Sequence, residues 1–108
     1  MARPVRKINV VNEGAFVMAY DLTIFDLDIG QELTFNGFRS GEFPVGSNQE
    51  VDLIGQLDLP AGTFVKPNVH AAAGTDKEAD LFVQVADNDQ TATYEAHGTT
   101  FSISIKLI

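Results

Sequence analysis

The sequence predicts an all-β protein, folded as a single antiparallel β-sandwich of seven or eight strands. The clearest evidence is the final stretch, where apolar side chains alternate with polar ones, at Phe101, Ile103, Ile105 and Leu107. Such alternation is typical of a strand with one buried and one solvated face. Turn signals recur about every ten residues, and no stretch shows sustained helical periodicity. Together these patterns favour an immunoglobulin-like architecture.

The first half of the chain contains four candidate strands. We expect them at residues 5–12, 15–27, 32–38 and 50–54. Asn12-Glu13-Gly14 has the composition of a tight turn, so the first two strands are predicted to pair as a hairpin. Residues 39–48 contain two glycines and a proline and are predicted to form a loop.

The second half shows the same alternation of predicted strands and turns. We expect strands at residues 63–72, 81–85 and 91–96, followed by the final strand. Pro67 lacks a backbone N–H, which favours an edge position or a bulge for its strand. The exposed edge that can pair with a partner is then expected to be a terminal strand.

Length and composition restrict the class of protein. A chain of 108 residues corresponds to one domain, residues 1–108, and the absence of cysteine excludes disulfides and thiolate metal sites. The net charge of −8 makes nucleic acids and anionic membranes poor partners. No apolar run has the length of a signal peptide or a transmembrane segment. The expectation is a soluble protein, cytoplasmic by default or exported by a leaderless route.

No catalytic constellation is recognisable in the sequence. The two histidines, His70 and His97, have no evident orienting partner, and no serine lies in a nucleophile-elbow context. The glycine-rich stretch 41–46 lacks the lysine of a phosphate-binding loop. We therefore expect a protein that is not an enzyme, without catalytic residues.

Acidic residues near strand ends leave calcium open as a ligand. Asp87 and Asp89 flank Asn88, and such hard oxygen donors on loops are typical of calcium modules. Turns also favour Asp and Asn for their local hydrogen bonds, without any metal. The expectation is no cofactor, with calcium at Asp87 and Asp89 as the alternative.

One aromatic residue stands apart from the strand patterns. Phe43 lies next to Pro44 in the predicted loop, where strand alternation does not assign it to the core. Most of the eight phenylalanines are expected to fill the core, as apolar side chains usually do. Phe43 is therefore a candidate for an exposed apolar contact.

Two short motifs resemble a known family. Residues 14–23, Gly-Ala-Phe-Val-Met-Ala-Tyr-Asp-Leu-Thr, and residues 98–101, Gly-Thr-Thr-Phe, resemble the carboxy-terminal membrane-recognition domain of cholesterol-dependent (thiol-activated) cytolysins. That family has a Gly-Ala-Tyr-Val motif before a long alternating strand and a Gly-Thr-Thr-Leu motif in a loop. Its tryptophan-rich undecapeptide has no counterpart after Val69, where residues 70–75 read His-Ala-Ala-Ala-Gly-Thr.

The resemblance implies an antiparallel β-sandwich and a non-enzymatic binding module that contacts lipid or a membrane glycan through its end loops. The family recognises sterol through a Thr-Leu pair, which corresponds to Thr100 and Phe101 in this chain. The candidate ligand contacts are Thr99, Thr100, Phe101, Phe43 and His70.

Two other functions and one conformational question stay open. The chain is alternatively a structural or protein-interaction module that forms homo-oligomers, or a calcium-dependent binder. Strict alternation places Phe101 in the core with Ile103, whereas a turn at Thr100 and Phe101 exposes its ring. The sequence supports both orientations.

Overall fold

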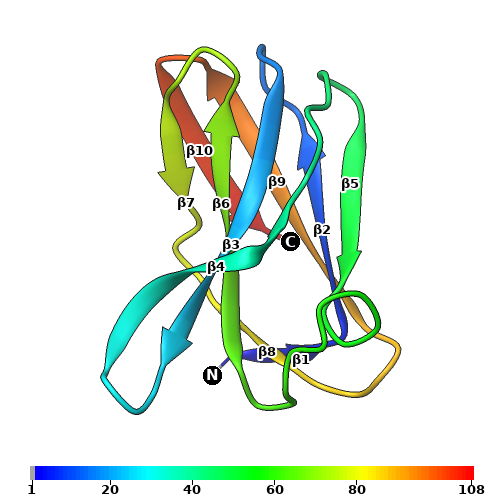
Figure 1. Cartoon of the computed structure of the whole chain (residues 1–108). Coiled ribbons are helices and arrows are strands. Elements are labelled where there is room, and N and C mark those ends of the chain that lie inside the picture. The colour runs from blue at the N-terminus through cyan, green and yellow to red at the C-terminus, as the bar shows by residue number, and fades with distance from the viewer. Residues whose placement is uncertain (1) are drawn as a thin grey trace.

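Two β-sheets pack with their apolar faces together in the computed structural model, which describes residues 2–108 (Figure 1). Among these residues there is no helix with the length and apolar character needed to cross a membrane. The described residues form ten strands: β1 (Arg3–Val5), β2 (Lys7–Asn12), β3 (Met18–Asp26), β4 (Gln31–Arg39), β5 (Asn48–Asp52), β6 (Phe64–Ala71), β7 (Asp76–Glu78), β8 (Val83–Val85), β9 (Thr91–Thr99) and β10 (Ser102–Leu107).

Both sheets are mixed. The first has the strand order β1-β8-β6-β3-β4, with β7 also paired to β6, and the second has the order β10-β9-β2-β5. Most neighbours are antiparallel, but β1 runs parallel to β8 and β2 runs parallel to β9. The all-β prediction is confirmed. The purely antiparallel pairing is wrong, the strand number exceeds seven or eight, and an immunoglobulin-like strand order is not confirmed.

The predicted hairpin between the first two long strands does not form. β2 pairs with β5 and β9 in the second sheet, whereas β3 pairs with β4 and β6 in the first. Both strands bury an apolar face, so the short connection carries the chain across the core from one sheet to the other. The turn chemistry after Asn12 is compatible with either route, because it fixes a change of direction and not a pairing partner.

Pro67 lies inside the first sheet and not at an edge. It sits in β6 opposite Leu22 of β3, and its own carbonyl accepts a hydrogen bond from Ala79 N at 3.0 Å on the other side. On that side β6 pairs with β8 through Phe64 and Val65, and with β7 from Asn68 onwards. Pro67 falls in the gap between these two short partners. A central strand tolerates proline here because no ladder donor is required at the gap.

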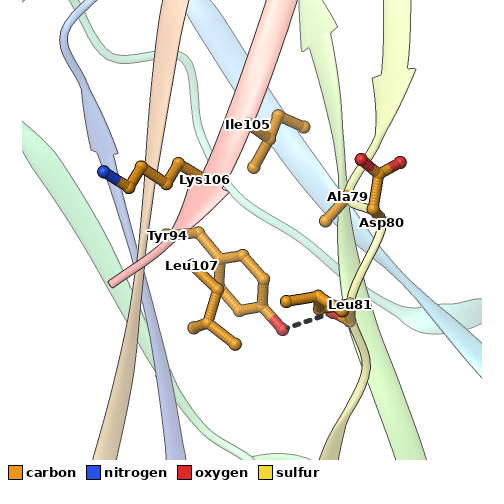
Figure 2. Close-up of a pocket in the computed structure, with 7 residues that line it drawn as sticks. All are labelled: Ala79, Asp80, Leu81, Tyr94, Ile105, Lys106 and Leu107. Atoms are coloured by element: carbon orange, nitrogen blue, oxygen red, sulfur yellow. Dashed lines mark hydrogen bonds between the residues drawn. The ribbon is translucent and has the colours of Figure 1, made fainter.

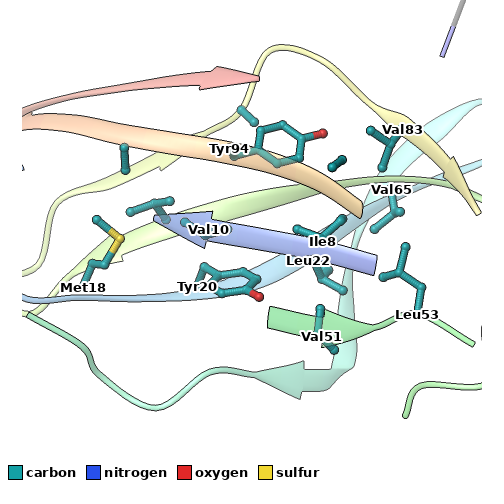
Figure 3. Packing of buried hydrophobic residues seen from close by; sticks show 14 of the residues in the cluster. Ile8, Val10, Met18, Tyr20, Leu22, Val51, Leu53, Val65, Val83 and Tyr94 are labelled. Carbon is teal, nitrogen blue, oxygen red and sulfur yellow. The ribbon is translucent and has the colours of Figure 1, made fainter. Parts of the chain in front are cut away.

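The core lies between the sheets, and Figure 3 shows its side chains converging from both. Two tyrosines are its largest fully buried members, Tyr20 from β3 and Tyr94 from β9. Their hydroxyls donate to backbone carbonyls, Tyr20 to Gln49 at 3.0 Å and Tyr94 to Leu81 at 2.8 Å. Each phenol thus buries its ring and still satisfies its polar atom. Other residues of this core are Ile8, Val10, Met18, Leu22, Val51, Leu53, Val65, Val69 and Val83.

We predict that the protein loses stability in alkaline solution through these two tyrosines. Burial raises the pKa of the Tyr20 and Tyr94 hydroxyls above the usual value of about 10, and Glu50 adds to the effect at Tyr20. The unfolded chain releases these protons first, so their contribution is complete below pH 10 and declines as pH rises above it. Each tyrosine should then lower the free energy of unfolding by about 1.4 kcal/mol per pH unit.

Urea unfolding measured between pH 8 and pH 11.5 checks this slope. Tyr94→Phe removes one ionising group and should reduce the decline above pH 10 by about half. Because the chain has only two tyrosines, phenolate absorbance should appear together with unfolding. Phenolate formation in the folded protein near pH 10 would contradict the burial argument.

Candidate functional site

Four loops meet at one end of the two sheets, the upper end in Figure 1. We call this region the loop end and define it as residues 13–17, 44–47, 72–75 and 100–101. Backbone hydrogen bonds join neighbouring loops. Ala15 N donates to Gly98 O at 2.9 Å, Ala72 N donates to Val17 O at 2.9 Å, and Gly46 N donates to Asn12 O at 2.7 Å. The loop end is therefore one connected surface.

A single buried amide organises the centre of the loop end. Asn12 is fully buried at the end of β2, and its Nδ2 donates to Phe16 O at 2.7 Å and to Phe43 O at 3.1 Å. Its Oδ1 accepts a hydrogen bond from Gly14 N at 3.0 Å. Because buried backbone groups need partners, this one side chain fixes two loops that are distant in the sequence.

The position of Asn12 could have been identified from the sequence. Asn12 follows Ile8 and Val10 at a period of two, which places it on the buried face of its strand, and Gly14 follows two residues later. A buried asparagine must find several partners, so the pattern predicts a satisfied polar hub. Nothing in the sequence near Asn12 indicates that the loop around Phe43 supplies one of these partners.

Phe43 is a core residue, so its prediction as an exposed contact is wrong. Its side chain is only 2% exposed and packs edge-on against Tyr20, with ring centroids 6.3 Å apart. Its backbone N donates to Met18 O at 2.7 Å, and Met18 N donates to Phe43 O at 3.1 Å. This bridge holds the segment after β4 against the start of β3 and turns the ring inward.

Phe101 lies at the tip of a tight turn, and its ring faces solvent. Thr99 of β9 is opposite Ser102 of β10, which leaves Thr100 and Phe101 as the two turn residues. Phe101 is 90% exposed, Thr99 is exposed and Thr100 is partly covered. The final strand therefore begins at Ser102, and of the two orientations left open for Phe101 the turn with an exposed ring is the one that forms. Three of the predicted contacts, Thr99 to Phe101, do share one exposed tip.

The surface around this tip is apolar and nearly uncharged. Val17 and Val45 belong to the loop end and are 41% and 61% exposed. Glu13 is the only charged residue in its four segments, although the whole chain carries a charge of −8. Exposed apolar groups without surrounding charge are suited to contact with an apolar surface.

His70 does not join this tip as a free contact. Its Nε2 lies 3.0 Å from Asp21 Oδ2 and its Nδ1 lies 2.6 Å from Asp76 Oδ1. The side chain is only 16% exposed and belongs to the outer face of the first sheet. These contacts disfavour a direct role of His70 in binding a ligand at the loop end.

Asp87 and Asp89 do not form an open cation site. Arg6 Nη1 lies 2.9 Å from Asp87 Oδ1, and Asp89 Oδ1 accepts a hydrogen bond from Gln90 Nε2 at 3.1 Å. Calcium at this pair would have to compete with the guanidinium. Within residues 2–108, no three His, Cys, Asp or Glu side chains stand together in a way that could hold a metal ion.

A groove of about 360 Å³ opens beside β10 (Figure 2). Tyr94, Ile105 and Leu107 line it from the second sheet, and residues 79–81, in the connection between β7 and β8, line it from the other side. β10 is an edge strand of its sheet, as expected for a terminal strand. The groove contains no pair of titratable groups arranged for acid–base chemistry, since its charged members are Asp80 and Lys106 at its rim.

We predict that Asn12→Ala lowers the free energy of unfolding by about 3 kcal/mol, because three buried hydrogen-bonding groups lose their partner. Urea denaturation at neutral pH measures the loss. The matched control is Asn48→Ala, whose exposed side chain makes one hydrogen bond to Asn9 and should change stability by less than about 0.5 kcal/mol. Equal effects of the two substitutions would contradict a special role for the buried amide.

The turn itself depends on Gly98. Gly98 has a φ of +106°, and a Cβ at this position would overlap the Ser102 carbonyl oxygen. Gly98→Ala should therefore destabilise the protein by about 2 kcal/mol or more in the same assay. Gly41→Ala is the control, since an added Cβ there meets open space and the backbone φ is not positive. A stable Gly98→Ala protein would show that the turn has another backbone geometry.

Comparison with known proteins gives a fold but no family membership. No protein-family model matches the chain, and no curated protein sequence matches it. The fold is similar to that of several solved structures, three of which are described here. Pneumolysin matches with a TM-score of 0.51 and 15% identity, over 94% of this chain and 23% of its own. A Gram-negative toxin matches with a TM-score of 0.52 and 12% identity, over 94% of this chain and 22% of its own.

The third structure is a single domain of comparable length. The membrane-binding domain of pneumolysin matches with a TM-score of 0.50 and 15% identity, over 94% of each chain. This chain thus spans less than a quarter of the whole toxins but nearly all of that domain. The resemblance to the carboxy-terminal cytolysin domain is confirmed at the level of the fold, in a chain with few identical residues.

Proposed function

We propose that this chain is a membrane-binding module that contacts a lipid surface through the loop end, with Phe101 as its principal contact. The observation that carries the proposal is the 90% exposure of Phe101 at the tip of a two-residue turn. The similarity in fold to the membrane-binding domain of pneumolysin supports a membrane-binding function for this chain. Thr99 and Thr100 flank the ring and supply hydroxyls for polar headgroups or a sterol hydroxyl.

Apolar insertion supplies the affinity in this proposal. Burying one phenylalanine contributes about 1.5–3 kcal/mol, and the exposed parts of Val17 and Val45 add to it. The charge of −8 opposes binding to anionic lipids, so neutral membranes are the preferred surface. A single copy binds weakly, and strong attachment requires several copies acting together.

A second candidate is a protein-interaction module that uses the β10 edge. The free edge of β10 and the apolar groove beside it favour this function, because a strand added there would also bury Ile105 and Leu107. Lys106 on the same strand counteracts indiscriminate edge pairing. This function predicts a concentration-dependent dimer in light scattering without any lipid.

We predict that the wild-type protein sediments with neutral phosphatidylcholine liposomes, and that Phe101→Asp reduces the partition coefficient about tenfold to a hundredfold. The size of the loss corresponds to removal of one buried phenylalanine. The assay compares liposomes with and without sterol, each with and without calcium. Dependence on sterol would show that sterol takes part in the contact, and dependence on calcium would favour the alternative of a calcium-dependent binder.

The matched control is Leu27→Asp, in the turn after β3 at the opposite end of the molecule. Leu27 is 69% exposed, so its substitution makes a similar change in charge and apolar surface at a distant place. Leu27→Asp should leave the partition coefficient within about twofold of wild type. Equal losses in both variants, or unchanged binding of Phe101→Asp, would remove Phe101 from the contact surface.

A further inference from the structure

The buried polar atoms without a hydrogen-bond partner gather at one place. Among the described residues these atoms are Asp21 Oδ1, Asn68 Oδ1 and His70 Nε2. Asp21 of β3 is the register partner of Asn68 of β6, and His70 follows Asn68 by two residues on the same face of β6. The three side chains therefore form one cluster on the outer face of the first sheet.

Asp76 orients the histidine of this cluster. The carboxylate Oδ1 of Asp76, from the neighbouring β7, lies 2.6 Å from His70 Nδ1. A carboxylate at this distance accepts a hydrogen bond from Nδ1–H, so in this tautomer the Nε2 atom is available as a metal ligand. This arrangement is the one that carboxylates give to metal-binding histidines in proteins.

The other side of the ring faces the Asp21 carboxylate. His70 Nε2 lies 3.0 Å from Asp21 Oδ2 without the geometry of a hydrogen bond, and Asp21 Oδ1 and Asn68 Oδ1 lie unpaired beside it. A cation placed among these atoms would satisfy the Asp21 carboxylate, the Asn68 amide oxygen and the Nε2 lone pair of the neutral ring together. Arg39 Nη1 is the nearby cation at 3.9 Å from Asp21 Oδ2, at the limit of an ion pair.

We propose that Asp21, Asn68 and His70 bind one divalent transition-metal ion of the Zn²⁺ type. His70 Nε2, the Asp21 carboxylate and Asn68 Oδ1 are its protein ligands, with water in the remaining position, and Asp76 acts as a positioning residue through His70. A mixed set of imidazole nitrogen and oxygen donors suits Zn²⁺ and its neighbours rather than Ca²⁺ or Mg²⁺.

The site differs from ordinary zinc sites in one ligand. Only Asp21 and His70 among its ligands are of the residue types that usually hold zinc, and the third ligand is an amide oxygen. The side chains of Asp21 and His70 are 14% and 16% exposed, so the proposed ligand set is largely shielded from solvent. Bound metal would join β3 to β6 and, through Asp76, to β7. This inference is independent of the proposed membrane contact.

Equilibrium dialysis of the chelator-treated protein against Zn²⁺ alone tests the proposal. We expect one Zn²⁺ per chain in the wild type, and visible absorption from Co²⁺ bound at the same site. His70→Ala should abolish both signals. Asp76→Asn leaves all three ligands in place and should weaken Zn²⁺ binding about tenfold to a hundredfold.

The matched control is His97→Ala, which removes the second histidine of the chain. His97 is 44% exposed and lies 3.4 Å from Glu95, so it represents ordinary surface binding of metal. Full binding in His97→Ala, with loss in His70→Ala and weakening in folded Asp76→Asn, would support the site. The proposal is overturned by absent wild-type binding at millimolar Zn²⁺, by equal loss in both histidine variants, or by unchanged affinity in Asp76→Asn.

Discussion

The three hydrogen bonds of the Asn12 side chain are the interaction on which the loop end depends. The chain leaves β2 at Asn12, crosses the core and enters β3 in the other sheet, so its backbone groups lose their ladder partners at a buried place. Asn12 supplies replacements to Phe16, Phe43 and Gly14. The same residue thus permits the crossing between sheets and positions the segment that buries Phe43.

Polar and apolar surface are distributed unevenly around this frame. The outer face of the first sheet holds a polar row, with Thr23 donating to Glu78 at 3.1 Å and Lys66 pairing with Glu32 at 3.2 Å. The loop end has almost no charge and presents Phe101 at its tip. An acidic protein can therefore offer one apolar surface without placing its charges against a membrane. The arrangement separates the two proposed sites, since the tip is apolar and the sheet face carries polar ligands.

The sequence determined the local elements because alternation is a property of each strand alone. Residues 91–96 and 102–107 were recognisable as strands from their period of two, and the turn signals around Asp87 and Gly98 bounded them. The Thr99 to Phe101 motif was also identified, as a resemblance to a Gly-Thr-Thr-Leu loop. The exposed tip of the candidate site could therefore be predicted, apart from the direction of its phenylalanine.

Only the tertiary structure decided which strands are neighbours and which way critical side chains face. A period of two indicates that one face of a strand is buried. It does not indicate whether two consecutive strands pair in one sheet or lie in the two facing sheets, so the hairpin of β2 and β3 was mispredicted. Pro67 is tolerated in a central strand because β7 and β8 leave a gap, which depends on residues far along the chain. Phe101 faces solvent because the pairing of Thr99 with Ser102 leaves it in a two-residue turn, and Phe43 faces the core because its long-range bridge to Met18 turns it inward.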